Sequence, residues 1–274
     1  MAQQAETEGG EGKDRQFVTA LARGIRILQC FDTYTPELSC SELAKRTGLP
    51  QPTVWRLCHT LLECGMLVTV NGDKLRPGLA VLQLGYSAIS GLSILELARP
   101  KMQALASAHG AACGLAIRDG YNMVFVARCE GESQLIMNLR VGSTVPLATS
   151  ALGWAYIAGQ RGTNRATLLA ELRAHDPAAM ERVAVDLDAA LREYDRHGYI
   201  INEGVFHRAY TTVSVPIIDA DGSVAYTLNC GAATGAVSAE AQKRLIAPEL
   251  IALANSLQAV IRQGRLQSPA EPQV

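Results

Sequence analysis

The chain lacks the patterns that usually mark a metal, cofactor or hydrolytic site. Its seven cysteines, at positions 30, 40, 58, 64, 113, 129 and 230, form no Cys-x-x-Cys pair, so a metal site is not expected. Several of them fall on apolar faces, which indicates reduced, packed thiols in a cytoplasmic protein. There is no glycine-rich phosphate loop and no Gly-x-Ser-x-Gly nucleophile elbow, so we expect no cofactor.

Long apolar runs and a strong net charge are also missing. No stretch of about 18 uncharged apolar residues is present, so the sequence predicts no membrane-spanning helix and no membrane partner. Residues 1–14 are polar and acidic without a hydrophobic signal core, and residues 265–274 are similarly polar, so we expect a disordered lead-in and tail. The length of 274 residues suffices for two domains of ordinary size.

Residues 15–78 carry, in order, the parts of a winged helix-turn-helix DNA-binding domain. Ser39 and Glu42 form the capping box of a short helix, and Gly48 supplies the conformation that ends it. A second helix is predicted over 52–64, with a proline in its first turn. Asn71-Gly72 then predicts a hairpin, the wing. Because such proteins read the major groove with the second helix while the hairpin follows the backbone, the expected partner is double-stranded operator DNA.

The second helix is predicted to bury one face and present the other to DNA. Val54, Leu57, Cys58, Leu61 and Leu62 share the apolar face. The opposite face and the hairpin carry short polar or cationic groups that can reach bases and phosphates. The candidate DNA-binding residues are Arg23, Ser39, Gln51, Pro52, Thr53, Trp55, Arg56, His59, Lys74 and Arg76.

The charge of this domain favours paired copies. Residues 15–90 hold eight Lys/Arg against five Asp/Glu, an excess of +3, although the whole chain has a net charge of −1. So small an excess predicts weak binding by one copy.

A helix over 17–31, with Val18, Leu21, Ile25 and Leu28 on one face, is expected to pack beneath the helix-turn-helix. Residues 79–92 read as a linker helix.

Residues 93–264 are expected to form an α+β effector-binding and oligomerisation domain with an antiparallel sheet faced by helices. Strands are predicted at 111–117, 121–128, 134–141, 199–202, 211–218 and 223–230. Helices are predicted from about 94, over 151–158, 164–173 and 177–197, and as one long closing helix over 238–263.

The motifs together resemble the IclR-type bacterial transcriptional regulators. The resemblance rests on Leu-Ala-Arg-Gly-Ile-Arg-Ile-Leu in the first helix, Ser-Glu-Leu-Ala-Lys-Arg-Thr-Gly-Leu-Pro and Thr-Val-Trp-Arg-Leu. It continues with Ser-Ala-Leu-Gly at 150–153, His-Gly-Tyr at 197–199, Val-Pro-Ile at 215–217 and Asp-Ala-Asp-Gly at 219–222. It implies a dimer or dimer of dimers on a partly palindromic operator, with a GAF-like sensor domain for a small organic acid. Members commonly control catabolic operons.

By family position, the resemblance implies an effector pocket whose walls include Met137, Asn202, Thr212, Asn229 and Gly231. The further effector-binding candidates are Ser150, Ala151, Leu152, Gly153 and Trp154. The helix that opens at Ser150 offers free N–H groups to a carboxylate. Asn202 stands where some members have Asp, and Trp154 replaces a residue that is often Lys. An uncharged, amide-rich pocket with an aromatic wall would suit an aromatic acid or amide.

Other interpretations remain open at this stage. Thr212 and Asn229 can simply pair within strands, Met137 can belong to the core, and Trp154 can face the core or a subunit interface. A hydrolase would need Cys113 or Cys129 with His109 as base and Asp119 to orient it. A winged helix can also serve as a protein-interaction module without DNA. Whether the chain activates or represses is not encoded in these motifs.

Overall fold

The computed structural model describes residues 16–32, 34–132 and 137–263. The chain divides into two compact units, with the boundary between Ser87 and Ala88, inside helix α4 (Leu79–Ser90). The expected disordered segments 1–14 and 265–274 lie outside the described residues.

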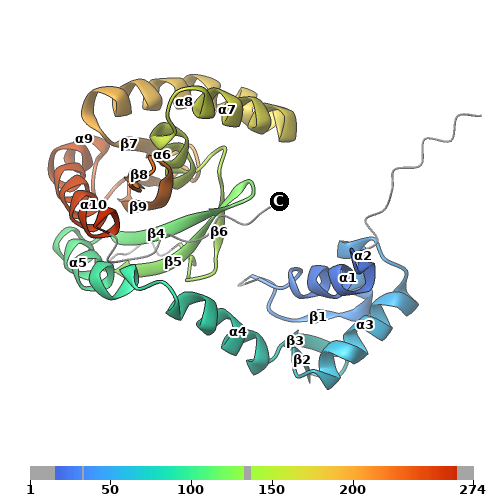
Figure 1. The fold of residues 1–274 in the computed structure, drawn as a ribbon. Coiled ribbons are helices and arrows are strands. Elements are labelled where there is room, and N and C mark those ends of the chain that lie inside the picture. Colours follow the sequence, from blue (N-terminus) through green and yellow to red (C-terminus); the bar gives the residue numbers. More distant parts are fainter. Residues whose placement is uncertain (1–15, 33, 133–136, 264–274) are drawn as a thin grey trace, which may run out of the picture. The chain divides into compact units, whose positions relative to one another are not determined.

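The first unit consists of three helices and a small antiparallel sheet (Figure 1). The helices are α1 (Thr19–Leu28), α2 (Cys40–Thr47) and α3 (Gln51–Glu63), and the strands are β1 (Leu38–Ser39), β2 (Leu67–Val70) and β3 (Lys74–Pro77) in the order β1-β3-β2. Their common core contains Ile27, Leu38, Leu43, Val54, Cys58, Leu67 and Leu75.

Contacts between neighbouring residues set where the helices and the hairpin of this unit begin and end, as predicted. The Ser39 hydroxyl accepts a hydrogen bond from the Glu42 amide (3.3 Å), and the Glu42 carboxylate accepts one from the Ser39 amide (2.8 Å). Gly48 ends α2 with a φ of 68°. The hairpin between β2 and β3 turns on Asn71 and Gly72, both with positive φ (43° and 84°), as a type I′ turn requires.

The prediction for the first helix is wrong in one respect. Val18, Leu21 and Ile25 were expected to pack beneath the helix-turn-helix, but they are 61%, 63% and 48% exposed. The helix instead buries Gly24 and Ile27. The helix packs against α2 and α3 through the face that carries Ile27, with Leu28 partly buried beside it. An apolar stripe is therefore left uncovered within one chain.

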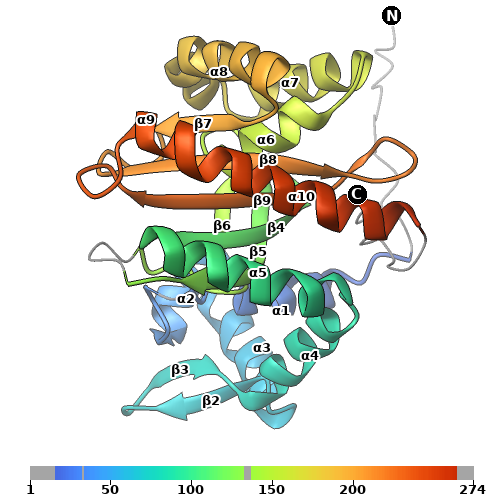
Figure 2. The ribbon, with the colours of Figure 1, turned by 90° about the vertical axis from the view of Figure 1, so that its left-hand side faces the viewer.

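The second unit contains a six-stranded antiparallel sheet between two layers of helices (Figures 1 and 2). Its strands are β4 (Ala112–Asp119), β5 (Asn122–Glu130), β6 (Thr144–Pro146), β7 (Ile200–Glu203), β8 (Tyr210–Ile218) and β9 (Val224–Ala233), in the order β6-β5-β4-β9-β8-β7. Helices α5 (Ile94–His109) and α10 (Ala247–Arg262) cover one face, and α6 (Ala151–Gly159), α7 (Thr163–His175) and α8 (Pro177–His197) lie on the other. The predicted α+β class is confirmed.

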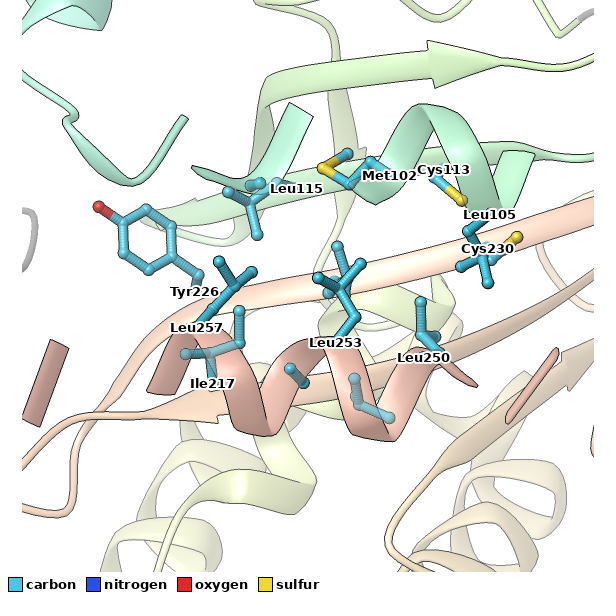
Figure 3. Close-up of a cluster of buried hydrophobic side chains, with 14 of the residues drawn as sticks. Met102, Leu105, Cys113, Leu115, Ile217, Tyr226, Cys230, Leu250, Leu253 and Leu257 are labelled. Atoms are coloured by element: carbon cyan, nitrogen blue, oxygen red, sulfur yellow. The ribbon is translucent and has the colours of Figure 1, made fainter. Parts of the chain in front are cut away.

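The face under α5 and α10 has a continuous apolar core (Figure 3). Met102 and Leu105 from α5 meet Leu250, Leu253 and Leu257 from α10 over the sheet. Within the described residues, the helical segment Ala239–Arg262 is long and apolar enough to cross a membrane by length and composition. Because Leu250, Leu253 and Leu257 are buried in the core cluster that it shares with α5 and the sheet, we assign it to this core.

Two predicted elements differ from the structure. Residues 134–136 of the strand expected over 134–141 lie outside the described residues, and 137–141 form no strand. A turn replaces it, in which the Ser143 amide donates to the Arg140 carbonyl and Gly142 has a φ of 86°. The closing helix runs over Ala239–Arg262, as predicted, but it contains a π-helical segment: α9 (Ala239–Ala241) leads into η1 (Gln242–Ile246) and then into α10. Pro248 in the first turn of α10 lacks the N–H that a continuous helix would use.

Candidate functional site

The outer face of α3 is exposed and polar, apart from one tryptophan. Pro52, Arg56 and His59 are exposed, while Val54 and Cys58 are buried on the opposite face. Trp55 is 60% exposed, and its ring lies 5.6 Å from that of His59, centroid to centroid. No described contact buries the Trp55 ring, so core packing does not explain it. Arg23, Lys74 and Arg76 are also exposed.

Two of the predicted DNA-binding residues have side-chain contacts within the chain, and a third is partly covered. The Ser39 hydroxyl donates to the Glu42 carboxylate (2.8 Å) in addition to accepting from its amide, so its first role is to cap α2. The Gln51 side chain donates to the Ser41 hydroxyl (3.2 Å), which links the start of α3 to α2. Thr53 is only half-exposed.

The second unit holds a small, partly open cavity against the face of the sheet that α6 adjoins. It is lined by Phe125, Arg128, Met137, Leu139, Val145, Ser150, Ala151, Leu152, Asn202, Phe206, His207, Tyr210, Thr212 and Asn229. Its volume is about 30 Å³, whereas pockets that hold small ligands are typically about 300–1,000 Å³. Side chains must therefore move to admit a ligand. The exposed loop residues Phe206 and His207 are suited to do so.

The sheet register explains how distant residues meet at this cavity. Asn202 on β7 is paired with Thr212 on β8, which is paired with Gly231 on β9. Asn229 lies opposite Gly114, and Gly114 lies opposite Arg128. The structure thus brings seven of the ten predicted pocket residues to the cavity lining, and Gly153, Trp154 and Gly231 are not among them.

Trp154 does not provide the predicted aromatic wall. It is 1% exposed, and its indole N–H donates to the Ala148 carbonyl (2.7 Å). Every residue of α6 is buried, because this helix runs between the sheet and the outer helices. The aromatic side chains at the cavity are Phe125, Phe206 and Tyr210.

Gly153 and Gly231 do not line the cavity, but they allow the backbone to pack closely beside it. A Cβ at Gly153 would overlap the Leu147 carbonyl, so only glycine lets the first turn of α6 pack against the preceding loop. A Cβ at Gly231 would lie 2.6 Å from the Tyr210 ring and 2.7 Å from the Thr212 hydroxyl. The Tyr210 hydroxyl donates to the Gly231 carbonyl (2.6 Å). Both glycines therefore position residues that line the cavity.

The polar groups at the cavity are only partly satisfied by the protein. Both polar atoms of the Asn202 amide have protein partners, since its N–H donates to the Thr149 carbonyl (3.0 Å) and its oxygen accepts from the Phe206 amide (3.2 Å). The Ser150 hydroxyl accepts from the Gly153 amide (3.1 Å) and caps α6. In contrast, the buried Oδ1 of Asn229 has no hydrogen-bond partner. A buried acceptor without a donor is costly, so a ligand that brings a donor would find a favourable position there.

Arg128 is the main residue that the sequence pattern missed. It belongs to the same face as Phe125 although the two are three positions apart, because the register of β5 shifts where Val126 has no partner on β4. Strict alternation would place them on opposite faces. An arginine at the end of an otherwise apolar strand was the available signal.

The thiols are not suited to catalysis. A hydrogen bond with Cys230 and burial raise the pKa of Cys113, and burial raises the pKa of Cys129. His109 lies beside Glu249 (Nε2–Oε1 3.3 Å). Since the thiolate is the nucleophile, these thiols are poorly reactive.

Comparison with known proteins agrees with this architecture. The family model of the IclR helix-turn-helix domain matches residues 20–70, and that of the bacterial transcriptional regulator IclR C-terminal domain matches residues 86–259. The transcriptional regulator TsaQ1/TsaQ2 of Comamonas testosteroni is 29% identical over 94% of this chain and 92% of its own. These relatives are transcription regulators, so the hydrolase and the interaction module without DNA are both rejected.

Solved structures show the same fold. An IclR family regulator from Brucella abortus has a TM-score of 0.79 and 36% identity, covering 93% of this chain and 97% of its own. An IclR homologue from Microbacterium hydrocarbonoxydans, complexed with 4-hydroxybenzoate, has a TM-score of 0.69 and 21% identity over 89% of this chain and 100% of its own. The chain belongs to the IclR family of bacterial transcriptional regulators, ligand-responsive proteins that bind operator DNA.

Proposed function

We propose that this regulator controls a catabolic operon in the cytoplasm and responds to a small aromatic acid. The observation that carries the proposal is the cavity itself, which combines three aromatic side chains with a buried guanidinium and an unpaired amide oxygen. A ligand with a flat apolar part and polar ends matches this lining. The homologue that binds 4-hydroxybenzoate has the same fold and supports this class of effector.

A thermal-shift screen of aromatic and small aliphatic acids tests the effector class. A ligand that binds only the folded protein at a hundred times its Kd adds about 2.7 kcal/mol of stability. We expect several aromatic acids to raise the melting temperature by a few degrees, and the small aliphatic acids to do so less. If only aliphatic acids stabilise the protein, the aromatic class is wrong.

We further propose that the functional unit is a homodimer or a dimer of dimers. The stripe of Val18, Leu21 and Ile25 on α1 is exposed, and so are Leu79, Leu82, Leu84 and Tyr86 on α4. Apolar surfaces of this kind mark association sites. Because the DNA-binding unit has so small a positive excess, paired copies would also multiply its phosphate contacts.

Replacing Leu21 by glutamate tests this interface. We expect sedimentation to show a shift towards the monomer and operator affinity to fall, because a charge then replaces an apolar contact. Val185→Glu is the matched control, since Val185 is 81% exposed on α8 and belongs to neither apolar surface. An unchanged sedimentation coefficient for Leu21→Glu would exclude α1 from the interface.

A further inference from the structure

The effector cavity is positively charged within the part of the chain that the structure describes. Its described lining contains one arginine and neither aspartate nor glutamate. The Arg128 side chain is 6% exposed. Burial of a cation is costly unless a partner compensates it, so the contacts of Arg128 decide whether it needs a ligand.

Within the described residues, the ion-pair partner of Arg128 is shared with a second arginine, and Arg128 also hydrogen-bonds the Tyr210 side chain. Its Nε lies 3.2 Å from Glu130 Oε1, and the same oxygen accepts a hydrogen bond from Arg140 Nη1 at 3.0 Å. Two guanidinium groups thus share one carboxylate, which leaves a local charge of +1. Glu130 engages the Nε edge of Arg128. The fork of terminal N–H groups is the part of a guanidinium that matches a planar carboxylate in two parallel hydrogen bonds.

The residues around Arg128 hold its guanidinium at the wall of the cavity. Arg128 Cζ lies 5.5 Å from the centroid of the Phe125 ring, within the range of a cation–π contact. Gly114 separates Arg128 from Asn229 in the sheet register, and a Cβ there would lie 2.6 Å from Asn229 Oδ1. The unpaired Asn229 oxygen is an independent sign that a ligand completes the polar contacts at this position.

Burial raises the pKa of the neighbouring Tyr210 to about 12, and the Arg128 charge opposes that shift. The phenol is therefore neutral at physiological pH and offers Arg128 no anion. A carboxylate from outside the protein is the missing counter-charge.

We propose that Arg128 binds the carboxylate of the effector and makes the regulator selective for acids over their neutral analogues. This assignment rests on the proposed function. It names the residue that distinguishes an anionic effector from an uncharged molecule of the same shape.

Calorimetry with matched acid–amide pairs tests the assignment on the full-length protein. The probes are benzoate and benzamide, 4-hydroxybenzoate and 4-hydroxybenzamide, and phenylacetate and phenylacetamide. We expect the wild type to prefer the acids, and Arg128→Met to weaken acid binding about 10- to 100-fold, as for the loss of hydrogen bonds to a charged group. In Arg128→Met, the affinity for the amides should change by less than about 3-fold, because the apolar contacts between the ligand ring and the cavity are kept.

Arg140→Met is the matched control. It removes a charge from the same cluster and leaves Glu130 to Arg128 alone, but Arg140 does not line the cavity, so acid binding should fall by less than in Arg128→Met. Arg128→Lys keeps the charge without the fork and should show an intermediate loss, which serves if the methionine variant fails to fold.

The outcomes separate the two proposals. If the wild type binds none of the acids, the proposed effector class is wrong and this assignment falls with it. If the wild type binds acids but shows no preference over the amides, or Arg128→Met binds them as tightly, only the role of Arg128 is wrong. An equal loss in Arg140→Met would likewise overturn it, since it would point to a general charge effect.

Discussion

Arg56→Ala is expected to weaken specific operator binding by at least about 30-fold, because each copy of a dimer would lose a contact of roughly 1–3 kcal/mol. Arg56 is exposed on the outer face of α3, opposite the buried Val54 and Cys58. Its removal should therefore leave the fold and the effector affinity unchanged. Fluorescence anisotropy with operator DNA over a salt series measures the effect.

The salt series also identifies the kind of contact. A base contact would lower affinity for the specific site and relax its sequence preference, while a phosphate contact would lower affinity for all sequences and reduce the salt slope. Arg192→Ala is the matched control, because Arg192 forms only an exposed ion pair with Asp188 (3.5 Å) on α8. If Arg56→Ala binds the specific site as the wild type does, α3 is not the recognition helix.

Gly153→Ala is expected to destabilise the second unit by about 3 kcal/mol, the upper end of the usual range for overpacking. The added Cβ would overlap the backbone of Leu147, which cannot turn away as a side chain can. For a domain of this size the melting temperature should fall by roughly 6–12 °C. Effector binding should weaken as well, because the same turn positions Ser150, Ala151 and Leu152 at the cavity.

Gly235→Ala provides the comparison within the same unit. A Cβ at Gly235 meets nothing within 4 Å, so its melting temperature should stay close to that of the wild type. A small shift for Gly153→Ala, similar to that of Gly235→Ala, would show that the loop before α6 adjusts freely. The rigid helix N-terminus assumed at the cavity would then be incorrect.

Features that depend on a few adjacent residues could be predicted from the sequence. The capping box of Ser39 and Glu42, the end of α2 at Gly48 and the hairpin at Asn71-Gly72 all involve contacts within three residues or a single backbone conformation. Neighbouring residues alone determine such features. The antiparallel sheet and its helices followed from the same kind of signal.

Features that depend on which distant surfaces pack together could not be predicted from the sequence. The apolar stripe of α1 looked like a core face, yet the core of the first unit has room for Ile27 and leaves Leu21 exposed. Trp154 was expected at the ligand because of its type, but the helix that carries it is buried on all sides. Periodicity gives the faces of an element and does not tell which partner covers each face.

The residues that line the cavity could also be predicted only in part. Family position identified Asn202, Thr212 and Asn229, which lie on the strand register that forms the cavity. Arg128 was not predicted at the cavity because one unpaired residue in β5 changes which side chains share a face of the sheet. A single bulge is enough to reverse the alternation on which a strand prediction depends.

The central claim is that a ligand in this cavity controls the operator affinity of the DNA-binding unit. We propose that the effector shifts a population between two arrangements, with α4 as the connection. The decisive measurement is the operator Kd of the wild type, by anisotropy, with and without a saturating acid found by calorimetry. We expect a change of at least about 5-fold in either direction, as typical coupling free energies give, and a clearly smaller change for Arg128→Met at the same acid concentration. An acid that saturates the wild type and leaves its operator Kd unchanged would contradict the account.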